Sequence, residues 1–332
     1  MISRLENRLL VPLAAVAYYQ TRYSDGIESA KRAIKEAGRG DAQDALAEAY
    51  KFLDLALWDS GRIDQATHGE LAFEIYGELG DLRMQAGILN NMGAISHDMS
   101  RWEESASLYR RGLELADRIG DRSLGATMKF NLVELLIDRG LLDEAEPLIR
   151  EVIRLWRAAG AEADVADANR ELARILARRG SFDAARALLD AARAYQIHAG
   201  KKAEVLRTDV RRIELLLLEG RGSEALDLAD SARHAAASTD GGNVVETSLV
   251  RLRACALLQL GRLEEARTEL DAVIARATRR GERLDEALAL DARIQVAERL
   301  GESDSAFEAS RTGVFNELAI SATPDFATGL AA

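Results

Sequence analysis

Gly180-Ser-Phe-Asp-Ala-Ala185 repeats a pattern of residue types that also occurs in Gly61-Arg-Ile-Asp-Gln-Ala66, Gly140-Leu-Leu-Asp-Glu-Ala145 and Gly261-Arg-Leu-Glu-Glu-Ala266. The pattern is glycine, any residue, a large apolar residue, an acid, any residue and alanine. Related segments begin at residues 21, 100, 220 and 301, so that consecutive segments start 39 to 41 residues apart. A constant period over the whole chain is typical of a solenoid of stacked repeats.

A second series of glycines lies midway between these segments, at Gly40, Gly80, Gly120, Gly160, Gly200, Gly241 or Gly242, and Gly281. Glycine after a helix can adopt the left-handed conformation that ends the helix. Between the breaks, apolar residues such as Leu148, Val152 and Leu155 recur at helical spacing. Each period therefore predicts two antiparallel helices, and the chain about eight helix pairs.

The composition agrees with an all-helical chain. Of the 332 residues, 48% are apolar and 30% are charged, with 3 prolines and 5% aromatic residues. Such a balance suits packed amphipathic helices and provides few of the β-branched and aromatic residues that sheets prefer. We expect an all-α fold, with a kink or restart of the first helix at Pro12.

Three segments around the second and third repeats carry a family resemblance. Leu89-Asn-Asn-Met-Gly93, Trp102-Glu-Glu-Ser-Ala-Ser-Leu-Tyr109 and Arg118-Ile-Gly-Asp121 resemble the tetratricopeptide repeat (TPR) in its long variety of about 40 residues. The resemblance implies a TPR-like α-solenoid, a right-handed superhelix whose concave surface is lined by the first helix of every pair. We expect one repeat domain over residues 1–320, with turns near residues 21, 61, 100, 140, 180, 220, 261 and 301, and a tail at 321–332.

A narrower resemblance rests on Leu71-Ala-Phe-Glu-Ile-Tyr-Gly-Glu-Leu-Gly-Asp81 and Thr323-Pro-Asp325. These segments are similar to the C-terminal TPR region of bacterial class III adenylate/guanylate cyclase–ATPase signalling proteins and of related ATPase-coupled transcription regulators. The resemblance implies cyclase or ATPase modules as partners within a longer protein. The chain has no Gly-x-x-x-x-Gly-Lys-[Ser/Thr] phosphate loop, so it is either a fragment of such a protein or a stand-alone relative.

Residues that carry chemistry are sparse. The four histidines lie far apart in the sequence, and Cys255 is the only cysteine. Neither a metal site nor a catalytic set is predicted, and we expect no cofactor and no enzymatic activity. The net charge of −11 disfavours nucleic acid and anionic membrane surfaces as partners. The lone cysteine and the short apolar run at residues 9–17 favour a cytoplasmic protein without a membrane span.

The expected concave groove is the candidate binding surface. Its side chains are predicted at two slots of each first helix, ten and six residues before the turn, and we call these the groove positions. The slots hold Lys51, Asn90, Phe130, Arg170, Val210, Arg251 and Asp291, and Leu55, Ala94, Glu134, Arg174, Glu214, Cys255 and Gln295. The candidate binding residues are Asn90, its neighbour Asn91, Glu134, Arg170, Arg174, Glu214 and Arg251.

Two interpretations of these residues remain open. Asn90 and Asn91 favour hydrogen bonding to a peptide backbone, because asparagine is a poor helix former. Arg170 and Arg174 share a helix face that suits a carboxylate or phosphate. Alternatively, Glu134, Arg174 and Glu214, at equivalent slots, form an ion-pair ladder between repeats. The pairs Arg178-Arg179 and Arg211-Arg212 are predicted to lie on solvated faces.

The sequence thus favours a non-catalytic regulatory scaffold that docks a peptide or protein segment in its groove, within a bacterial signalling system. The alternative is a sensor that binds a small ligand or signalling peptide and changes its superhelical shape. A closed pocket with converging polar groups would favour the sensor, and an open groove would favour docking.

Overall fold

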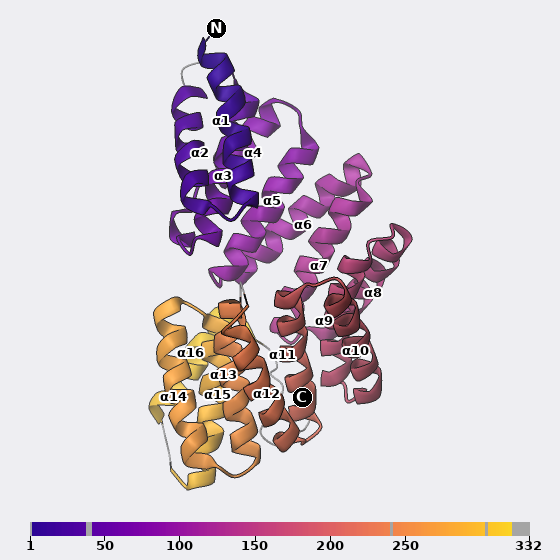
Figure 1. Cartoon of the computed structure of the whole chain (residues 1–332), viewed down its shortest axis with the longest axis vertical. Coiled ribbons are helices and arrows are strands. Elements are labelled where there is room, and N and C mark those ends of the chain that lie inside the picture. Colours follow the sequence, from indigo (N-terminus) through magenta and orange to yellow (C-terminus); the bar gives the residue numbers. More distant parts are fainter. Residues whose placement is uncertain (1, 38–41, 240–241, 303–304, 321–332) are drawn as a thin grey trace. The chain divides into compact units, whose positions relative to one another are not determined.

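The computed structural model describes residues 2–37, 42–239, 242–302 and 305–320, and every regular element among them is a helix (Figure 1). The all-α prediction is confirmed. The chain divides into two compact units, Met1–Asn131 (unit 1) and Leu132–Ala332 (unit 2), which are described separately below. The single domain over residues 1–320 stays a prediction, and the expected tail lies outside the described residues.

Within the described residues, eight helix pairs follow one another, as the repeat predicts. The first helices are α1 (Ile2–Tyr19), α3 (Gln43–Asp59), α5 (Leu82–Asp98), α7 (Arg122–Asp138), α9 (Glu162–Arg178), α11 (Lys202–Leu218), α13 (Glu246–Gln259) and α15 (Arg283–Leu300). The second helices are α2 (Tyr23–Ala37), α4 (Gly69–Glu78), α6 (Trp102–Ile119), α8 (Leu142–Ala158), α10 (Phe182–His198), α12 (Gly222–Ala236), α14 (Leu263–Arg280) and α16 (Ser305–Leu318). Short 3₁₀ segments, η1 (Ile63–Gln65) and η2 (Gly242–Val245), precede α4 and α13.

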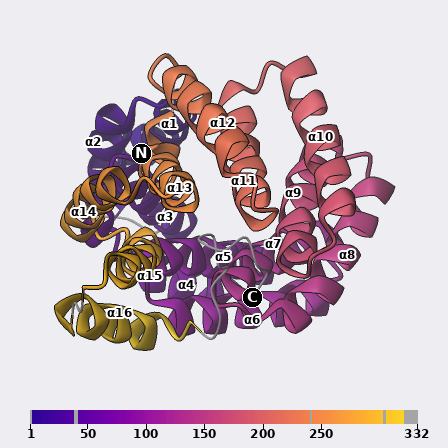
Figure 2. The ribbon, with the colours of Figure 1, turned by 90° about the horizontal axis from the view of Figure 1, so that it is seen from below.

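In unit 2 the first helices form a row. Helix α9 packs against α11, α11 against α13 and α13 against α15, while the second helices α10, α12 and α14 each pack against the first helices before and after them (Figure 2). The apolar side chains between the rows, such as Ile213, Leu249 and Leu257, are completely buried. This arrangement brings groove positions from consecutive repeats next to one another.

The turn between paired helices depends on one residue in the left-handed conformation. Gly180 has φ +73°, and its N–H and that of Ser181 donate to the carbonyls of Ala177 and Leu176. These bonds satisfy carbonyl groups at the end of α9. Thr21 and Ser100 take the glycine position in two repeats, and they adopt the same conformation, with φ 58° and 61°.

Ser100 is therefore strained, and Ser100→Gly is expected to raise the free energy of unfolding by about 0.5–1 kcal/mol. A side chain in the left-handed region costs about 1–2 kcal/mol. Glycine has more conformational freedom in the unfolded chain, which lowers the stability gained from the substitution by about 0.4–1 kcal/mol. Urea denaturation measures the change. The control Ser107→Gly, at an exposed site inside α6, lowers stability instead, and an equal loss in both variants would rule out the strain.

Side chains two residues before the turn glycine join consecutive repeats of unit 2. Arg178 Nη1 donates to the carbonyl of Ile137 over 2.6 Å, Gln259 Nε2 to that of Leu217 over 2.7 Å, and Arg299 Nη1 to that of Leu258 over 2.9 Å. Each accepting carbonyl belongs to the last turn of the preceding first helix and also accepts a hydrogen bond from the N–H of the turn glycine, so it accepts two hydrogen bonds in all. These bonds help to fix the register between repeats.

Helix α1 continues through Pro12 as one element, so the expected restart of the first helix does not occur, and the expected kink stays a prediction. The turn before Gly222 is regular, because Gly220 and Arg221 make the standard turn hydrogen bonds, and a Cβ on Gly222 would lie 3.0 Å from Gln259. The second helix of the pair after Gly61 begins only at Gly69, because Asp54 accepts hydrogen bonds from both the backbone and the ring of His68, each over 2.7 Å.

Candidate functional site

The groove positions of unit 1 are partly exposed. Lys51 and Leu55 on α3, Asn90 and Ala94 on α5, and Phe130 on α7 are all half-buried. Lys51 Nζ lies 3.0 Å from Glu48 and 4.5 Å from the ring centroid of Phe52. The candidate residues therefore lie within reach of a ligand in this unit.

Two asparagines connect adjacent first helices in unit 1. Asn131 Nδ2 on α7 donates to Asn90 Oδ1 on α5 over 3.0 Å. The bond orients the half-buried Asn90 side chain and leaves its amide nitrogen able to donate to another acceptor. Asn91 is also half-buried. The pair of side-chain amides of Asn90 and Asn131 (the amide pair) has the chemistry needed to hold the backbone of an extended peptide.

The groove positions of unit 2 are far more buried. Arg170 and Arg174 are each 6% exposed, Arg251 is 3% exposed and Glu214 is 9% exposed. Only Glu134 among the candidate residues of this unit is half-buried. Most of these side chains contact carboxylates instead of solvent.

Arg170 on α9 bridges two repeats. Its Nη1 donates to Asp167 over 2.9 Å and to Glu204 on α11 over 3.0 Å, and its Nε donates to Glu171 over 3.3 Å. Although burial favours the neutral guanidine, Glu171 and Asp167 raise the pKa of Arg170 above its usual value. Arg170 therefore stays charged at the interface between α9 and α11.

Arg174 continues the network in the other direction. Its Nη2 donates to Asp138 on α7 over 2.7 Å, and its Nη1 donates to Glu171 over 2.9 Å. Burial would raise the pKa of Glu171, but Arg174, Arg211 and Arg170 together lower it to about 2. Arg174 thus makes an ion pair between repeats, with Asp138 as its partner. The ladder through Glu134, Arg174 and Glu214 stays a prediction.

The network extends to α13 and α15. Arg251 Nε donates to Asp285 over 2.7 Å, and Ser248 Oγ donates to the same carboxylate over 2.9 Å. Glu214 on α11 accepts two hydrogen bonds from Arg211 Nη1, over 2.9 and 3.1 Å. Burial would raise the pKa of Glu214, but Arg211, Arg174, Arg251 and Arg178 lower it.

The sequence analysis missed several members of this network. Glu171, Asp138 and Asp285 were not singled out, because carboxylates are common on these helices. Arg178 and Arg211 were predicted to lie on solvated faces, and both predictions were wrong, since each side chain is half-buried. The available signal for Arg178 was its place two residues before a turn glycine, a position that it shares with Gln259 and Arg299.

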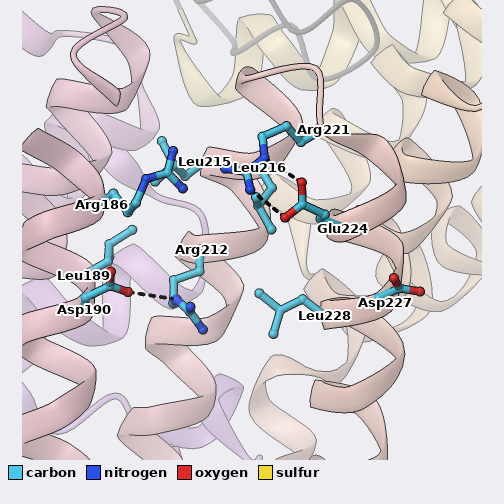
Figure 3. Close-up of a pocket in the computed structure, with 10 residues that line it drawn as sticks. All are labelled: Arg186, Leu189, Asp190, Arg212, Leu215, Leu216, Arg221, Glu224, Asp227 and Leu228. Carbon is cyan, nitrogen blue, oxygen red and sulfur yellow. Dashed lines mark hydrogen bonds and ion pairs between the residues drawn. The ribbon is translucent and has the colours of Figure 1, made fainter. Parts of the chain in front are cut away.

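A separate groove lies between α10, α11 and α12 (Figure 3). It has a volume of about 450 Å³, and its apolar lining residues are Leu189, Leu215, Leu216 and Leu228. Arg212 lies 3.5 Å from Asp190, and Arg221 pairs with Glu224 over 2.5 Å along its sides. Its three arginines and three carboxylates balance in charge, so the groove gives no preference for an ionic ligand.

Other classes of site receive no support in the described part of the chain. No group of three or more His, Cys, Asp or Glu side chains there is placed to hold a metal ion. Cys255 is 2% exposed and packs as a small core residue. None of the described helices combines the length and apolar character needed to cross a membrane.

Comparisons of the sequence with protein-family models and with characterised proteins find no match. Comparison with solved structures finds several similar proteins. A Rap protein in complex with Competence and Sporulation Factor has a TM-score of 0.70, with 13% identity over 95% of this chain and 98% of that chain. NprR in complex with its cognate peptide NprX has a TM-score of 0.66, with 12% identity over 98% and 92% of the two chains.

A third similar structure is aspartyl phosphate phosphatase F from Bacillus subtilis, with a TM-score of 0.66 and 14% identity over 82% of this chain and 70% of that chain. The fold is a TPR-like solenoid. At these identities the likeness concerns the fold alone, and a fold does not establish a function. The function has to be argued from the residues of this chain.

Proposed function

We propose that this chain is a non-catalytic regulatory scaffold that docks a peptide segment on the groove positions of its first helices. The observation that carries the proposal is the Asn90–Asn131 pair, which presents a half-buried amide between adjacent first helices of unit 1. The whole-chain likeness to two structures solved with a bound factor or peptide supports it. A cytoplasmic setting fits a protein of this kind.

Docking is favoured over a small-ligand sensor by the shape of the surface. A sensor for small molecules normally encloses its ligand in a largely preformed pocket lined by apolar and a few polar groups. The described cavities of 410 to 510 Å³ have Arg, Lys, Asp or Glu side chains at their sides, and none of them is lined by a candidate groove residue, although one is lined by Glu204, the partner of Arg170. An extended segment fits better, since its backbone can use the amide pair and its side chains can contact Phe130 and Leu55.

The narrower connection to cyclase and ATPase modules remains a prediction from Leu71–Asp81 and Thr323–Asp325. The solved structures described above give it no support. Peptide docking does not depend on it, because the residues that carry docking lie on α5 and α7.

Binding of a random heptapeptide library, measured by fluorescence anisotropy, tests the proposal. The wild-type chain is expected to select peptides, and Asn90→Ala is expected to weaken their binding about fivefold to tenfold, the value of one hydrogen bond. The control Arg110→Ala removes an exposed side chain of the second helix α6 and leaves binding unchanged. Selected peptides that bind Asn90→Ala as tightly as the wild type would move docking away from this face.

A further inference from the structure

Helix α1, the first helix of unit 1 (Figure 1), exposes an apolar face. Leu9 is 63% exposed, Leu13 54% and Val16 47%. Residues spaced by three or four positions lie on one face of a helix. Although 30% of the residues of the chain are charged, the exposed face of α1 from residue 9 onward has no charged residue. Its members are Leu9, Pro12, Leu13, Val16 and Tyr19, and we call them the α1 face.

The equivalent face of α3 is buried in the contact between repeats. With the period of 40 residues, Leu9, Pro12, Leu13 and Val16 correspond to Ala49, Phe52, Leu53 and Ala56, all of which are buried. The ring centroid of Phe52 lies 6.0 Å from that of Tyr18 on α1, and a Cβ on Gly26 of α2 would lie 3.7 Å from Ala56 Cβ. The α1 face is therefore a repeat-packing face that no described helix covers.

The last helix pair, in unit 2, ends differently. The exposed residues of α16 are mainly polar and include Glu308, Ser310, Thr312, Asn316 and Glu317. Terminal repeats of a solenoid need such a polar outer face to stay soluble. If the α1 face of one copy packed on α16 of another, these polar groups would be buried against leucine side chains without hydrogen-bond partners. Head-to-tail stacking of copies is therefore disfavoured.

We propose that the α1 face is a contact between two copies of this chain, related by a two-fold axis near Leu13. In a two-fold contact the same patch is used by both copies. With the two α1 helices antiparallel, Leu9 of one copy lies near Val16 of the other, and Leu13 lies near its own equivalent. Like charges would repel in such a contact, and the α1 face has none. The net charge of −11 opposes association through the charged surfaces.

The contact is small. The exposed part of α1, from Leu9 to Tyr19, is about 15 Å long at about 1.5 Å per residue. One helix face per copy buries less than the roughly 1,200 Å² at which stable interfaces begin. The dimer is therefore reversible, with a dissociation constant of about 10–100 µM. Dimerisation and docking are independent, because the residues that carry docking lie on α5 and α7.

Sedimentation velocity of the full chain between about 1 and 300 µM measures the association. Leu13→Glu places two like charges opposite each other at the axis and is expected to weaken the dimer at least about tenfold. Leu71→Glu is the matched control, since Leu71 is 45% exposed on α4 of the same unit, and it is expected to dimerise as the wild type does. Circular dichroism verifies that the variants fold.

The variant Leu13→Lys tests the two-fold axis directly. By itself it is expected to be monomeric, for the same reason as Leu13→Glu. An equimolar mixture of the two variants is expected to associate again, because opposite charges then meet at the axis. This rescue requires that position 13 of one copy lies next to position 13 of the other.

A wild-type chain that stays monomeric at every concentration would overturn the proposal. A dimer that Leu13→Glu leaves intact would also overturn it, since the contact would then lie elsewhere. Loss of the dimer in Leu13→Glu without rescue in the mixture would exclude the two-fold contact. Phosphatidylcholine vesicles test a lipid surface as the occupant. Flotation of a monomeric wild type with these vesicles, lost in Leu13→Glu, would assign the α1 face to a membrane surface instead of a second copy.

Discussion

Replacement of Glu171 by glutamine is expected to lower the free energy of unfolding by about 3–5 kcal/mol, the usual cost of removing one partner from a buried ion pair. Glu171 is 1% exposed and accepts hydrogen bonds from both Arg170 and Arg174. Without its charge, the two guanidinium groups remain buried close together with fewer acceptors. Urea denaturation followed by circular dichroism measures the loss.

The matched control is Glu224→Gln. Glu224 also pairs with an arginine three residues away, Arg221, but it is exposed. A surface ion pair of this kind contributes about 0–1 kcal/mol, so the control is expected to change stability little. Equal effects of the two substitutions would show that Glu171 does not act as a buried charge.

The same network predicts a dependence of stability on pH. The pKa of Glu171 is about 2 in the folded chain and lies in the ordinary glutamate range, about 4.3, in the unfolded chain. Because the folded pKa is the lower one, its stabilisation is complete above about pH 5 and is lost as the pH falls toward 2. Glu171→Gln lacks this component, so its stability should fall less between pH 5 and pH 2 than that of the wild type.

Replacement of Gly93 by alanine is expected to lower the free energy of unfolding by about 1–3 kcal/mol, the usual cost of overpacking. A Cβ at Gly93 would lie 2.6 Å from Cε1 of Tyr109, whose ring is 2% exposed and has no room to move. The Gly93 carbonyl also accepts a hydrogen bond from Ser105 Oγ over 2.8 Å. Helices α5 and α6 would have to separate, although alanine is the better helix former.

Gly87→Ala on the same helix is expected to raise the free energy of unfolding. A Cβ there meets no atom within 4 Å, so the helix gains about 0.5–1 kcal/mol from the lower flexibility of alanine in the unfolded chain. Measurement of both variants in one urea series separates packing from helix propensity. Stabilisation by both alanines would mean that α5 and α6 do not approach closely at Gly93.

The helix pairs were predictable from sequence because the turns depend on local chemistry. Gly180 and its equivalents mark positions that need a left-handed residue, and the period holds even where Ser100 or Thr21 takes that place. The late start of α4 was not predictable, since it depends on Asp54, which lies 14 residues before His68 and binds it twice. Turn chemistry is local, whereas this interruption arises from a contact between helices.

The candidate site was predictable in position and less so in environment. The slots of Arg170, Arg174, Glu214 and Arg251 do lie together along the first helices, as the repeat implies. Their burial was not foreseen, because it depends on Glu171 and Asp138, which are ordinary surface residue types. The role of Arg178 depends on a carbonyl 41 residues earlier in the chain, and such a partner becomes apparent only once the repeats are stacked.

Photo-crosslinking tests most directly the central claim that the groove positions dock a peptide. Benzoylphenylalanine takes the place of Phe130, a half-buried groove position on α7, and in a second variant the place of Ile197, an exposed apolar residue on the second helix α10. Each variant is irradiated with the heptapeptide library, and the crosslinked peptides are identified by mass spectrometry. We expect crosslinks from position 130 that an excess of unlabelled library suppresses, with none from position 197. Crosslinks from position 197 alone would contradict docking on the first helices.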